Sequence, residues 1–357
     1  MTNVDSLYRP CRLCPRRCGS CRTIPPRGEK SAAGSGYCGE SAALRLACAS
    51  IHRGEEPPLT GGTSGGGSGT IFVSGCNLGC GFCQNRQISA GWSLPTRQKR
   101  ASQVSARQIP AGRPVLTEEF ARICLALQNR GAENINIVTG SHAVPALAAG
   151  IAAARAGISG AAEGPDRLRV PVLWNSSAYE LPETLDLLSD TVDVFLPDMK
   201  TLDGDIAGRY CGAPDYPAAA KGAIRKMIAM RSLRFEKAPG AGGPDRMVSG
   251  VMIRHLVLPG HTEATRTVLR WFADHCAGRA LLSVMFQYTP LGAGPQGYVT
   301  KAEAGRVLGW LEEFGINEGY CQEPVPGNTG WLPDFEKTNP FPSELSVPVW
   351  HWRDGFV

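Results

Sequence analysis

Six short apolar runs recur along the chain from residue 70 onward, with stretches of helical spacing between them. The runs are Thr70–Ser74, Ile135–Thr139, Val170–Asn175, Val192–Pro197, Val251–Leu258 and Leu281–Tyr288. Short runs that are largely apolar are typical of parallel strands buried on both faces. Their alternation with helical stretches predicts an α/β fold built as a parallel βα array. The pattern leaves open whether the sheet is open or curls into a closed or partial barrel.

Capping signals mark the ends of several predicted helices. Thr117 is a candidate N-cap and Gly131 a candidate stop for one helix, and Thr262 is a candidate N-cap for another. Thr300 and Glu303 have the spacing of a capping box ahead of a further helix.

The composition divides the chain into four predicted regions. Residues 1–60 form a cysteine-rich head, residues 61–69 a Gly/Ser linker, and residues 70–320 the βα array. Residues 321–357 form a tail rich in Pro and Trp, with Trp331, Trp350 and Trp352. We expect the tail to wrap the array and bury its aromatic side chains. The alternative is that it docks a partner or shields the open end of the array.

Composition and charge exclude several classes of protein. The chain has 357 residues, of which 43% are hydrophobic and 19% charged, as in ordinary globular proteins. We expect no membrane span, and a cytoplasmic location, because no apolar run is long enough and Met1–Pro10 lacks a signal pattern. A net charge of +5 does not predict a nucleic-acid surface. Thirteen cysteines in such a chain indicate metal or redox chemistry rather than disulfides.

Three cysteines follow the first apolar run at close spacing. Cys76, Cys80 and Cys83 form C-x3-C-x2-C. Thiolates are the usual ligands of iron–sulfur clusters. Because a cubane cluster has four irons, three thiolates leave one iron free to bind a substrate or cofactor directly. The spacing therefore predicts a catalytic [4Fe-4S] site, and the alternatives are a zinc site or a buried group of thiols.

This motif, with the strand before it and Phe82 within it, resembles that of the radical S-adenosylmethionine (SAM) superfamily. The resemblance implies that the open iron binds SAM and that Phe82 lies against the adenine. It also implies an enzyme that cleaves SAM reductively to a 5′-deoxyadenosyl radical, which abstracts a hydrogen atom. The implied fold is a six-stranded partial TIM-like barrel with the cluster at its C-terminal mouth.

Further segments resemble the pyruvate formate-lyase activating enzyme branch of that superfamily. They are Asn134–Thr139, Val172–Glu180, Val192–Lys200, Ala213–Tyr216, Ile253–Gly260, Met285–Pro290, and the head segments Cys11–Cys18 and Gly36–Gly39. This branch implies an electron donor such as flavodoxin or ferredoxin and a glycyl-radical enzyme as target. It implies neither membrane nor nucleic acid as a partner.

Polar residues follow the predicted strands and are candidates for cofactor binding, because strand ends of βα folds carry functional groups. The resemblance implies that Asp198 and Lys200 contact SAM, with Lys200 as a partner for its carboxylate. Thr139, Gly140 and Ser141 are candidates to present hydroxyl and backbone donors to the SAM carboxylate. The resemblance implies that Asn175, Ser177 and Tyr288 line the SAM or substrate pocket. The chain has Thr-Gly-Ser-His at 139–142, where many members carry Gly-Gly-Glu to hold the SAM amino group. Which atoms replace that acidic group stays open.

The head carries a second set of cysteines, at positions 11, 14, 18, 21 and 38. Four thiolates suit a tetrahedral zinc ion or an auxiliary iron–sulfur cluster, and the sequence does not decide between them. The resemblance favours Cys11, Cys14, Cys18 and Cys38 as ligands and leaves Cys21 as a spare.

Three functional hypotheses remain at this stage. The first is a radical SAM activase for a glycyl-radical enzyme, and the second is a radical SAM enzyme acting on a small molecule or another protein. The third, of a different class, is a non-catalytic zinc or iron–sulfur binding or regulatory protein.

Overall fold

The parallel strands lie where the apolar runs predicted them. The computed structural model describes residues 4–24, 36–62, 65–89, 111–158, 166–237, 245–323, 325 and 332–357. In order along the sheet, the strands are β2 (Ser68–Val73), β4 (Ile135–Val138), β5 (Val172–Ser176), β6 (Val194–Pro197), β8 (Arg246–Leu256) and β9 (Leu281–Met285). Each pairs in parallel with the next. All six predicted strands are therefore confirmed.

The sheet is larger than the six predicted strands. In the described part of the chain it has twelve, with the path β10-β9-β8-β6-β5-β4-β2-β1-β11-β12, while β3 pairs with β1 and β7 with β8. The added strands are β1 (Arg45–His52), β3 (Arg113–Pro114), β7 (Arg234–Glu236), β10 (Gly319–Cys321), β11 (Ser346–His351) and β12 (Gly355–Phe356). Of these, β10 pairs in parallel with β9, whereas β1 and β11 extend the other edge in antiparallel fashion. The fold is thus mixed α/β with one large sheet.

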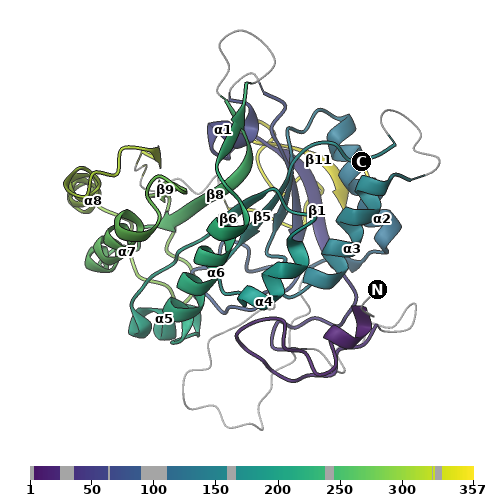
Figure 1. Ribbon diagram of the computed structural model, residues 1–357, viewed down its shortest axis with the longest axis horizontal. Coiled ribbons are helices and arrows are strands. Elements are labelled where there is room, and N and C mark those ends of the chain that lie inside the picture. Colours follow the sequence, from purple (N-terminus) through teal and green to yellow (C-terminus); the bar gives the residue numbers. More distant parts are fainter. Residues whose placement is uncertain are drawn as a thin grey trace.

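Helices line the sheet from α2 and α3 at one side to α7 and α8 at the other (Figure 1). The structure has η1 (Val4–Leu7), α1 (Pro57–Thr60), α2 (Thr117–Asn129), α3 (Val144–Ala156), α4 (Pro182–Leu185), η2 (Asp186–Leu188), α5 (Gly204–Cys211), α6 (Tyr216–Met230), α7 (Thr262–His275) and α8 (Lys301–Glu313). Phe120, Leu127 and Ile151 are fully buried on α2 and α3, as their helical spacing requires.

The capping predictions have mixed outcomes. Thr300 accepts from the amide of Glu303 and the Glu303 carboxylate accepts from the Thr300 amide, so the capping box of α8 is confirmed. The predictions for Thr117 and Thr262 are wrong, because Leu116 and His261 are the N-caps and each threonine is the first residue inside its helix.

Two predicted regions contribute strands to the sheet. Strand β1 lies in the segment predicted as the head, and β11 lies in the predicted tail. The last residues of the predicted linker, Ser68 and Gly69, belong to β2. At Gly66 a Cβ would lie 1.7 Å from the carbonyl oxygen of Gly131, so close packing requires glycine there. The division into four regions stays a prediction.

The tail packs against the sheet. Trp350 on β11 is fully buried, which confirms that the tail buries aromatic side chains. Phe335 and Phe341 pack against Phe72 of β2, with ring centroids 5.2 and 5.6 Å from it. Trp331 lies outside the described residues. A role of the tail in docking a partner stays a prediction.

A buried ionic group joins the segment before α1 to strand β8. Arg254 of β8 contacts the carboxylates of Glu55 and Glu56, which precede α1, and its side chain is 8% exposed. The Asn136 amide of β4 donates to Glu55 at 3.0 Å. The segment before α1 therefore connects β4 to β8.

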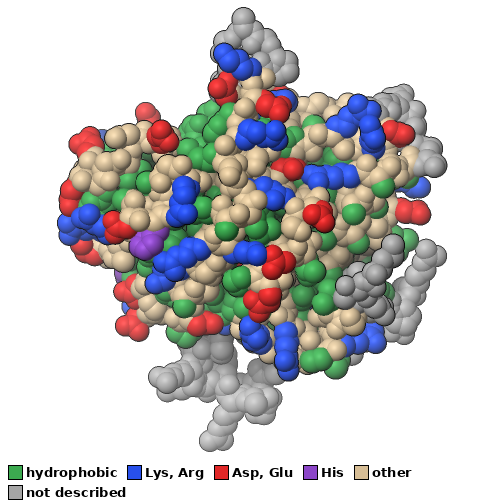
Figure 2. All heavy atoms as spheres, in the orientation of Figure 1, with side chains coloured by type: hydrophobic (Ala, Val, Ile, Leu, Met, Phe, Trp, Pro, Cys, Tyr) green, Lys and Arg blue, Asp and Glu red, His purple; other side chains and the backbone are tan. Residues whose placement is uncertain are grey.

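On the face seen in Figure 2, basic and acidic side chains are interspersed. Within the described ranges, none of the helices has the length and apolarity needed to cross a bilayer.

Candidate functional site

The loop after β2 carries the three predicted cluster ligands. Gly75 starts it with φ = 89°, and a Cβ there would lie 2.4 Å from Glu40 Cγ, so both conformation and space demand glycine. The Leu78 amide donates to Cys76 Sγ at 3.4 Å, and the Ser89 hydroxyl donates to Cys83 Sγ at 3.5 Å. Hydrogen bonds of this kind stabilise thiolates and orient metal ligands.

The three thiols lie close enough to influence one another. Burial raises the pKa of Cys76. The neighbouring thiols of Cys80 and Cys83 raise it further, whereas the positive charge of Lys200 lowers it. Burial also raises the pKa of Cys83, with Cys80 adding to the effect. Three adjacent thiolates repel one another in a partly buried loop, so a bound cationic group relieves the repulsion.

In the described residues, neither the head thiols nor any other group of three or more His, Cys, Asp or Glu side chains is placed to hold a metal ion. Thiolates are the usual ligands of iron–sulfur clusters, so the three thiols of this loop fit such a cluster by their chemistry. Cys76, Cys80 and Cys83 would hold such a cluster.

The end of helix α5 supports this loop. The amides of Gly79 and Gly81 donate to the carbonyls of Cys211 and Tyr210, at 3.1 and 2.8 Å. These carbonyls have no partner within the helix, so the loop satisfies them. The thiols of Cys80 and Cys211 share a hydrogen bond, which with burial raises the pKa of Cys80. Cys211 was given no role from the sequence, because nothing local marks it.

Asp198 and Lys200 lie beside the cysteines at the end of β6. Lys200 Nζ lies 2.7 Å from Asp198 Oδ2. Burial alone would lower the pKa of Lys200, but Asp198 and Cys80 raise it well above its ordinary value. The Lys200 amide donates to the Tyr216 hydroxyl at 2.9 Å, and this hydroxyl lies 2.9 Å from the Ser177 carbonyl. Tyr216, which the sequence did not single out, thus ties the ends of β5 and β6 together.

Phe82 of the cluster loop and Tyr288, a candidate for the pocket lining, lie near each other. Their ring centroids are 6.0 Å apart and both side chains are buried. The Tyr288 hydroxyl donates to the Pro295 carbonyl at 2.7 Å, and burial raises its pKa. Its ring rather than its hydroxyl is therefore left for contacts with a ligand.

The segment after β4 has a conformation and packing that favour particular residues. Thr139 has φ = 65°, a region that β-branched residues rarely adopt and that is often found at functional sites. Its amide donates to the carbonyl of Asn175 at 2.9 Å. At Gly140, a Cβ would lie 2.5 Å from Trp174 Cη2. Glycine is thus required there by packing as well as by any approach to a ligand.

A buried carboxylate lies beneath this segment. Glu180 accepts from Trp174 Nε1 at 2.7 Å and from Ser176 Oγ at 2.6 Å, and it also shares a hydrogen bond with Ser141. Burial raises its pKa. Ser177 Oγ is buried and has no partner among the described residues, so it is left to bind a ligand. The sequence placed Glu180 in a matching segment but did not name it as a site residue.

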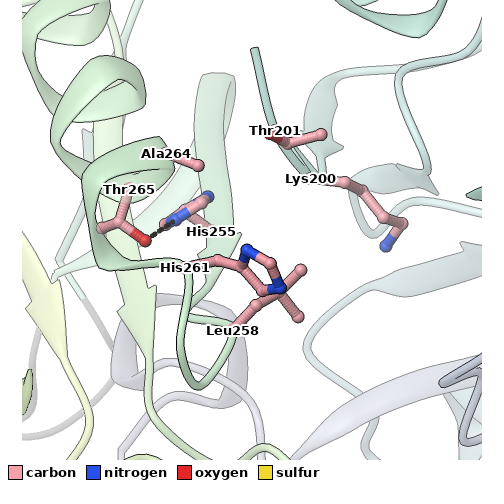
Figure 3. A pocket seen from close by; sticks show the side chains of 7 residues that line it. All are labelled: Lys200, Thr201, His255, Leu258, His261, Ala264 and Thr265. Atoms are coloured by element: carbon pink, nitrogen blue, oxygen red, sulfur yellow. Dashed lines mark hydrogen bonds between the residues drawn. The ribbon is translucent and has the colours of Figure 1, made fainter. Parts of the chain in front are cut away.

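A small pocket lies next to Lys200 (Figure 3). Lys200 and Thr201 line one side, and His255, Leu258, His261, Ala264 and Thr265 line the other. His255 Nε2 lies 2.9 Å from Thr265 Oγ1, and burial lowers the pKa of His255 to about 4. The histidine is therefore neutral near pH 7 and helps to fix α7 against β8.

The head thiols also converge. A Cβ at Gly36 would lie 3.4 Å from Cys38 Sγ and 3.5 Å from Cys18 Sγ, so both sulfurs border this glycine. Cys11 and Cys38 are buried, whereas Cys14 is partly buried and Cys18 exposed. Cys14 accepts from the Arg16 amide and Cys38 from the Glu40 amide, two positions on in each case. The same spacing holds for Cys76 with the amide of Leu78.

Other charges surround the head thiols. Arg22 Nη1 lies 3.7 Å from Cys11 Sγ and donates to the carbonyl of His142 at 2.7 Å. Burial raises the pKa of Cys38 to about 11, and Arg22 opposes this. Cys21 is exposed, and so is Cys18, so exposure does not distinguish the spare thiol from a ligand.

Comparisons with known proteins agree with this arrangement. A family model described as the radical SAM superfamily matches residues 70–272. The uncharacterized protein MJ0674 of Methanocaldococcus jannaschii is 27% identical over 287 residues, which cover 80% of this chain and 68% of that protein.

Solved structures show a weaker likeness. Streptococcus suis SuiB bound to S-adenosylmethionine is 13% identical with a TM-score of 0.41, and the match covers 70% of this chain and 48% of SuiB. The chain thus spans about half the length of SuiB. A radical SAM methyltransferase from Sphaerobacter thermophilus is also 13% identical, with a TM-score of 0.41 and coverage of 71% and 65%. Likeness of this degree carries no argument about substrate.

Proposed function

The chain belongs to the radical SAM superfamily, whose members use a [4Fe-4S] cluster and S-adenosylmethionine, and on this premise we propose that it is a SAM-cleaving enzyme. The observation that carries the proposal is the grouping of Cys76, Cys80 and Cys83 beside Lys200, where Cys80 and Cys83 raise the pKa of Cys76 and Cys80 raises that of Cys83. When bound and reduced, the cluster supplies the electron that cleaves SAM to methionine and a 5′-deoxyadenosyl radical, which abstracts a hydrogen atom.

The side chains around the triad have distinct proposed roles. Lys200, held by Asp198 at 2.7 Å, supplies a positive charge for the SAM carboxylate. Phe82, backed by Tyr288, offers an apolar surface to the adenine. Ser177 Oγ, buried without a partner among the described residues, and the neighbouring Asn175 supply polar contacts at the end of β5. Thr139 and Ser141 do so at the end of β4, and Glu180 orients Ser141.

The substrate belongs to the finer part of the proposal. Resemblance supports an activase of the pyruvate formate-lyase activating enzyme type, which removes a hydrogen from a glycine of a glycyl-radical enzyme. The alternative is a small molecule or another protein as hydrogen donor. In both versions an electron donor such as flavodoxin or ferredoxin reduces the cluster. Cys11, Cys14, Cys18 and Cys38 are proposed to hold zinc or an auxiliary iron–sulfur cluster in the head.

An anaerobic assay tests the proposal. The protein is reconstituted, reduced and given SAM, and 5′-deoxyadenosine is measured together with iron, sulfide and zinc per chain. Wild type should form 5′-deoxyadenosine, and the triple variant Cys76→Ala, Cys80→Ala, Cys83→Ala should form none while keeping the head metal. The control is Cys321→Ala, which removes an exposed thiol on β10 and should leave cleavage unchanged. Cleavage by the triple variant would contradict the assignment, and zinc throughout with no cleavage would favour a non-catalytic metal protein.

Lys200 is tested separately from the cluster. Lys200→Gln should weaken SAM binding in equilibrium dialysis, because it removes the charge opposite the carboxylate, while iron and sulfide per chain stay at the wild-type level. Wild-type SAM affinity in this variant would remove Lys200 from the pocket.

A further inference from the structure

One arginine of the head reaches the catalytic loop. Arg16 lies between Cys14 and Cys18, and its Nε donates to the carbonyl of Asn77 at 3.0 Å. Its Nη1 donates to the carbonyl of Gly212 at 2.8 Å. Asn77 directly follows the first cluster cysteine, and Gly212 directly follows helix α5. A single guanidinium therefore connects three segments that are far apart in the chain.

Aromatic rings fix the position of this guanidinium. Arg16 Cζ lies 4.1 Å from the ring centroid of Tyr37 and 5.0 Å from that of Tyr179. Tyr37 belongs to the head, whereas Tyr179 follows β5. The planar group is thus held by cation–π contacts from both sides of the boundary between head and sheet.

Asn77 makes the reciprocal connection. Its side-chain amide donates to the Tyr179 carbonyl at 2.6 Å and also hydrogen-bonds the Cys14 thiol. A residue of the catalytic loop therefore contacts a head thiol, while a residue of the head contacts the catalytic loop.

Tyr37 lies between the two sets of thiols. Its ring contacts Arg16, which donates to the residue after Cys76, and it directly precedes Cys38 of the head. The predicted head site and the predicted catalytic cluster are therefore neighbours in space.

One nitrogen of Arg16 has no partner among the residues that the structure describes. Nη2 is buried and makes no hydrogen bond to any part of the chain that the structure describes. A buried guanidinium N–H without an acceptor is costly, so it points to an acceptor supplied by a ligand. Thiolate and sulfide sulfurs of a bound iron–sulfur group are acceptors of this kind.

We infer that Arg16 is a positioning residue that couples the head to the catalytic cluster. It holds the Cys76–Cys80 segment against α5 in the shape that binds the cluster, and it places a permanent positive charge beside it. Reduction of the cluster by one electron from its donor adds one negative charge. A fixed positive charge nearby stabilises that reduced state, so Arg16 makes the cluster easier to reduce. The inference rests on the proposed function, because it requires a cluster on the three cysteines.

Charge and geometry can be separated by two substitutions at this position. Arg16→Gln removes the charge and the bridge, whereas Arg16→Lys keeps the charge but cannot donate to the carbonyls of Asn77 and Gly212 in the same fork. Arg12→Gln is the matched control, because it removes the same charge from an exposed position in the same loop of the head.

The measurements are iron and sulfide per chain after reconstitution and the midpoint potential of the cluster, followed by electron paramagnetic resonance without SAM. Arg16→Gln should lower cluster loading and shift the midpoint to a more negative potential. Arg16→Lys should restore most of the potential but not the loading, and Arg12→Gln should match wild type in both. Circular dichroism of each variant checks that the fold is retained, and if Arg16→Gln does not fold, Arg16→Lys alone carries the test through its loading.

The outcomes are distinguishable from failure of the proposed function. Wild-type protein that binds no cluster would overturn the proposed function and this inference with it. A wild-type cluster that keeps its loading and potential in Arg16→Gln would overturn the inference alone. An equal shift of potential in Arg12→Gln would also overturn it, because the effect would then be one of general surface charge.

Discussion

Removing Arg254 should lower the free energy of unfolding, because it leaves two buried carboxylates without their counter-ion. Arg254 contacts both Glu55 and Glu56, whose side chains are only 14% and 10% exposed. Arg254→Met keeps the apolar stem and removes the charge, so two adjacent carboxylates lose their counter-ion. Asn136 still donates to Glu55 at 3.0 Å, but one neutral donor does not replace a guanidinium.

The expected loss is large compared with the stability of a folded protein. Breaking a buried ion pair by removing one partner costs about 3–5 kcal/mol, out of about 5–15 kcal/mol in total. The assay is urea unfolding of the metal-free protein at pH 7.5, followed by tryptophan fluorescence. The variant Glu55→Gln, Glu56→Gln, Arg254→Met removes all three charges and should recover most of the loss.

The loss of stability in Arg254→Met should depend on pH. Burial raises the pKa of Glu56, but the charge and hydrogen bond of Arg254 outweigh this effect. The pKa of Glu56 in the folded protein therefore lies below the ordinary value. In wild type this stabilisation is fully present above about pH 4.5 and is lost as the pH falls through the folded pKa. In Arg254→Met, burial is no longer opposed and Glu56 takes up a proton at higher pH. The cost should therefore shrink from pH 7.5 to 5.5. A cost below about 1 kcal/mol, or one that is the same at both pH values, would refute this account of the buried group.

Three further predictions concern other parts of the fold. Thr300→Ala removes the N-cap of α8 and should lower the free energy of unfolding by about 1 kcal/mol. Thr117→Ala, at an exposed threonine without a capping bond, should change it by less than about 0.5 kcal/mol. Equal losses in urea unfolding would contradict the capping assignment. Trp350→Ala, at a fully buried position of the tail, should lower the free energy of unfolding by about 3–5 kcal/mol. Val347→Ala, at a side chain that is 37% exposed on the same strand, should lower it much less. A stable Trp350→Ala variant with reduced turnover would instead favour a role of the tail at the open end of the βα array. Burial lowers the pKa of His255 to about 4, so its contribution to stability is present above pH 6.5 and is lost as the pH falls toward 4. His255→Gln should therefore flatten the decline in the urea midpoint over this pH range. An unchanged slope would show that His255 does not cause the decline.

Local patterns accounted for most of the parallel sheet. The apolar runs predicted β2, β4, β5, β6, β8 and β9 because strands buried on both faces need continuous hydrophobic sequence. They did not predict β1 or β11. These strands lie outside the βα array, and they form by pairing with each other and with β2 rather than by a pattern of their own.

The cysteine spacing likewise predicts the thiols proposed as cluster ligands, but it does not predict their surroundings. C-x3-C-x2-C is a property of one loop and is visible in the sequence. Cys211, Glu180 and Tyr216 escaped notice because each acts on a partner in another segment. Nothing in the sequence around Arg16 indicates a bond to Asn77, 61 positions away.

The sequence by itself determined the βα order, the six parallel strands and the thiol ligands proposed for the cluster, because hydrophobic periodicity and ligand spacing act over a few residues. The tertiary structure alone decided that the head lies against the catalytic loop, that α5 supports this loop, and that Glu55 and Glu56 neutralise Arg254. These contacts exist only once the sheet has brought distant segments together. Their strength comes from burial, which makes each polar or charged group depend on a partner from elsewhere in the chain.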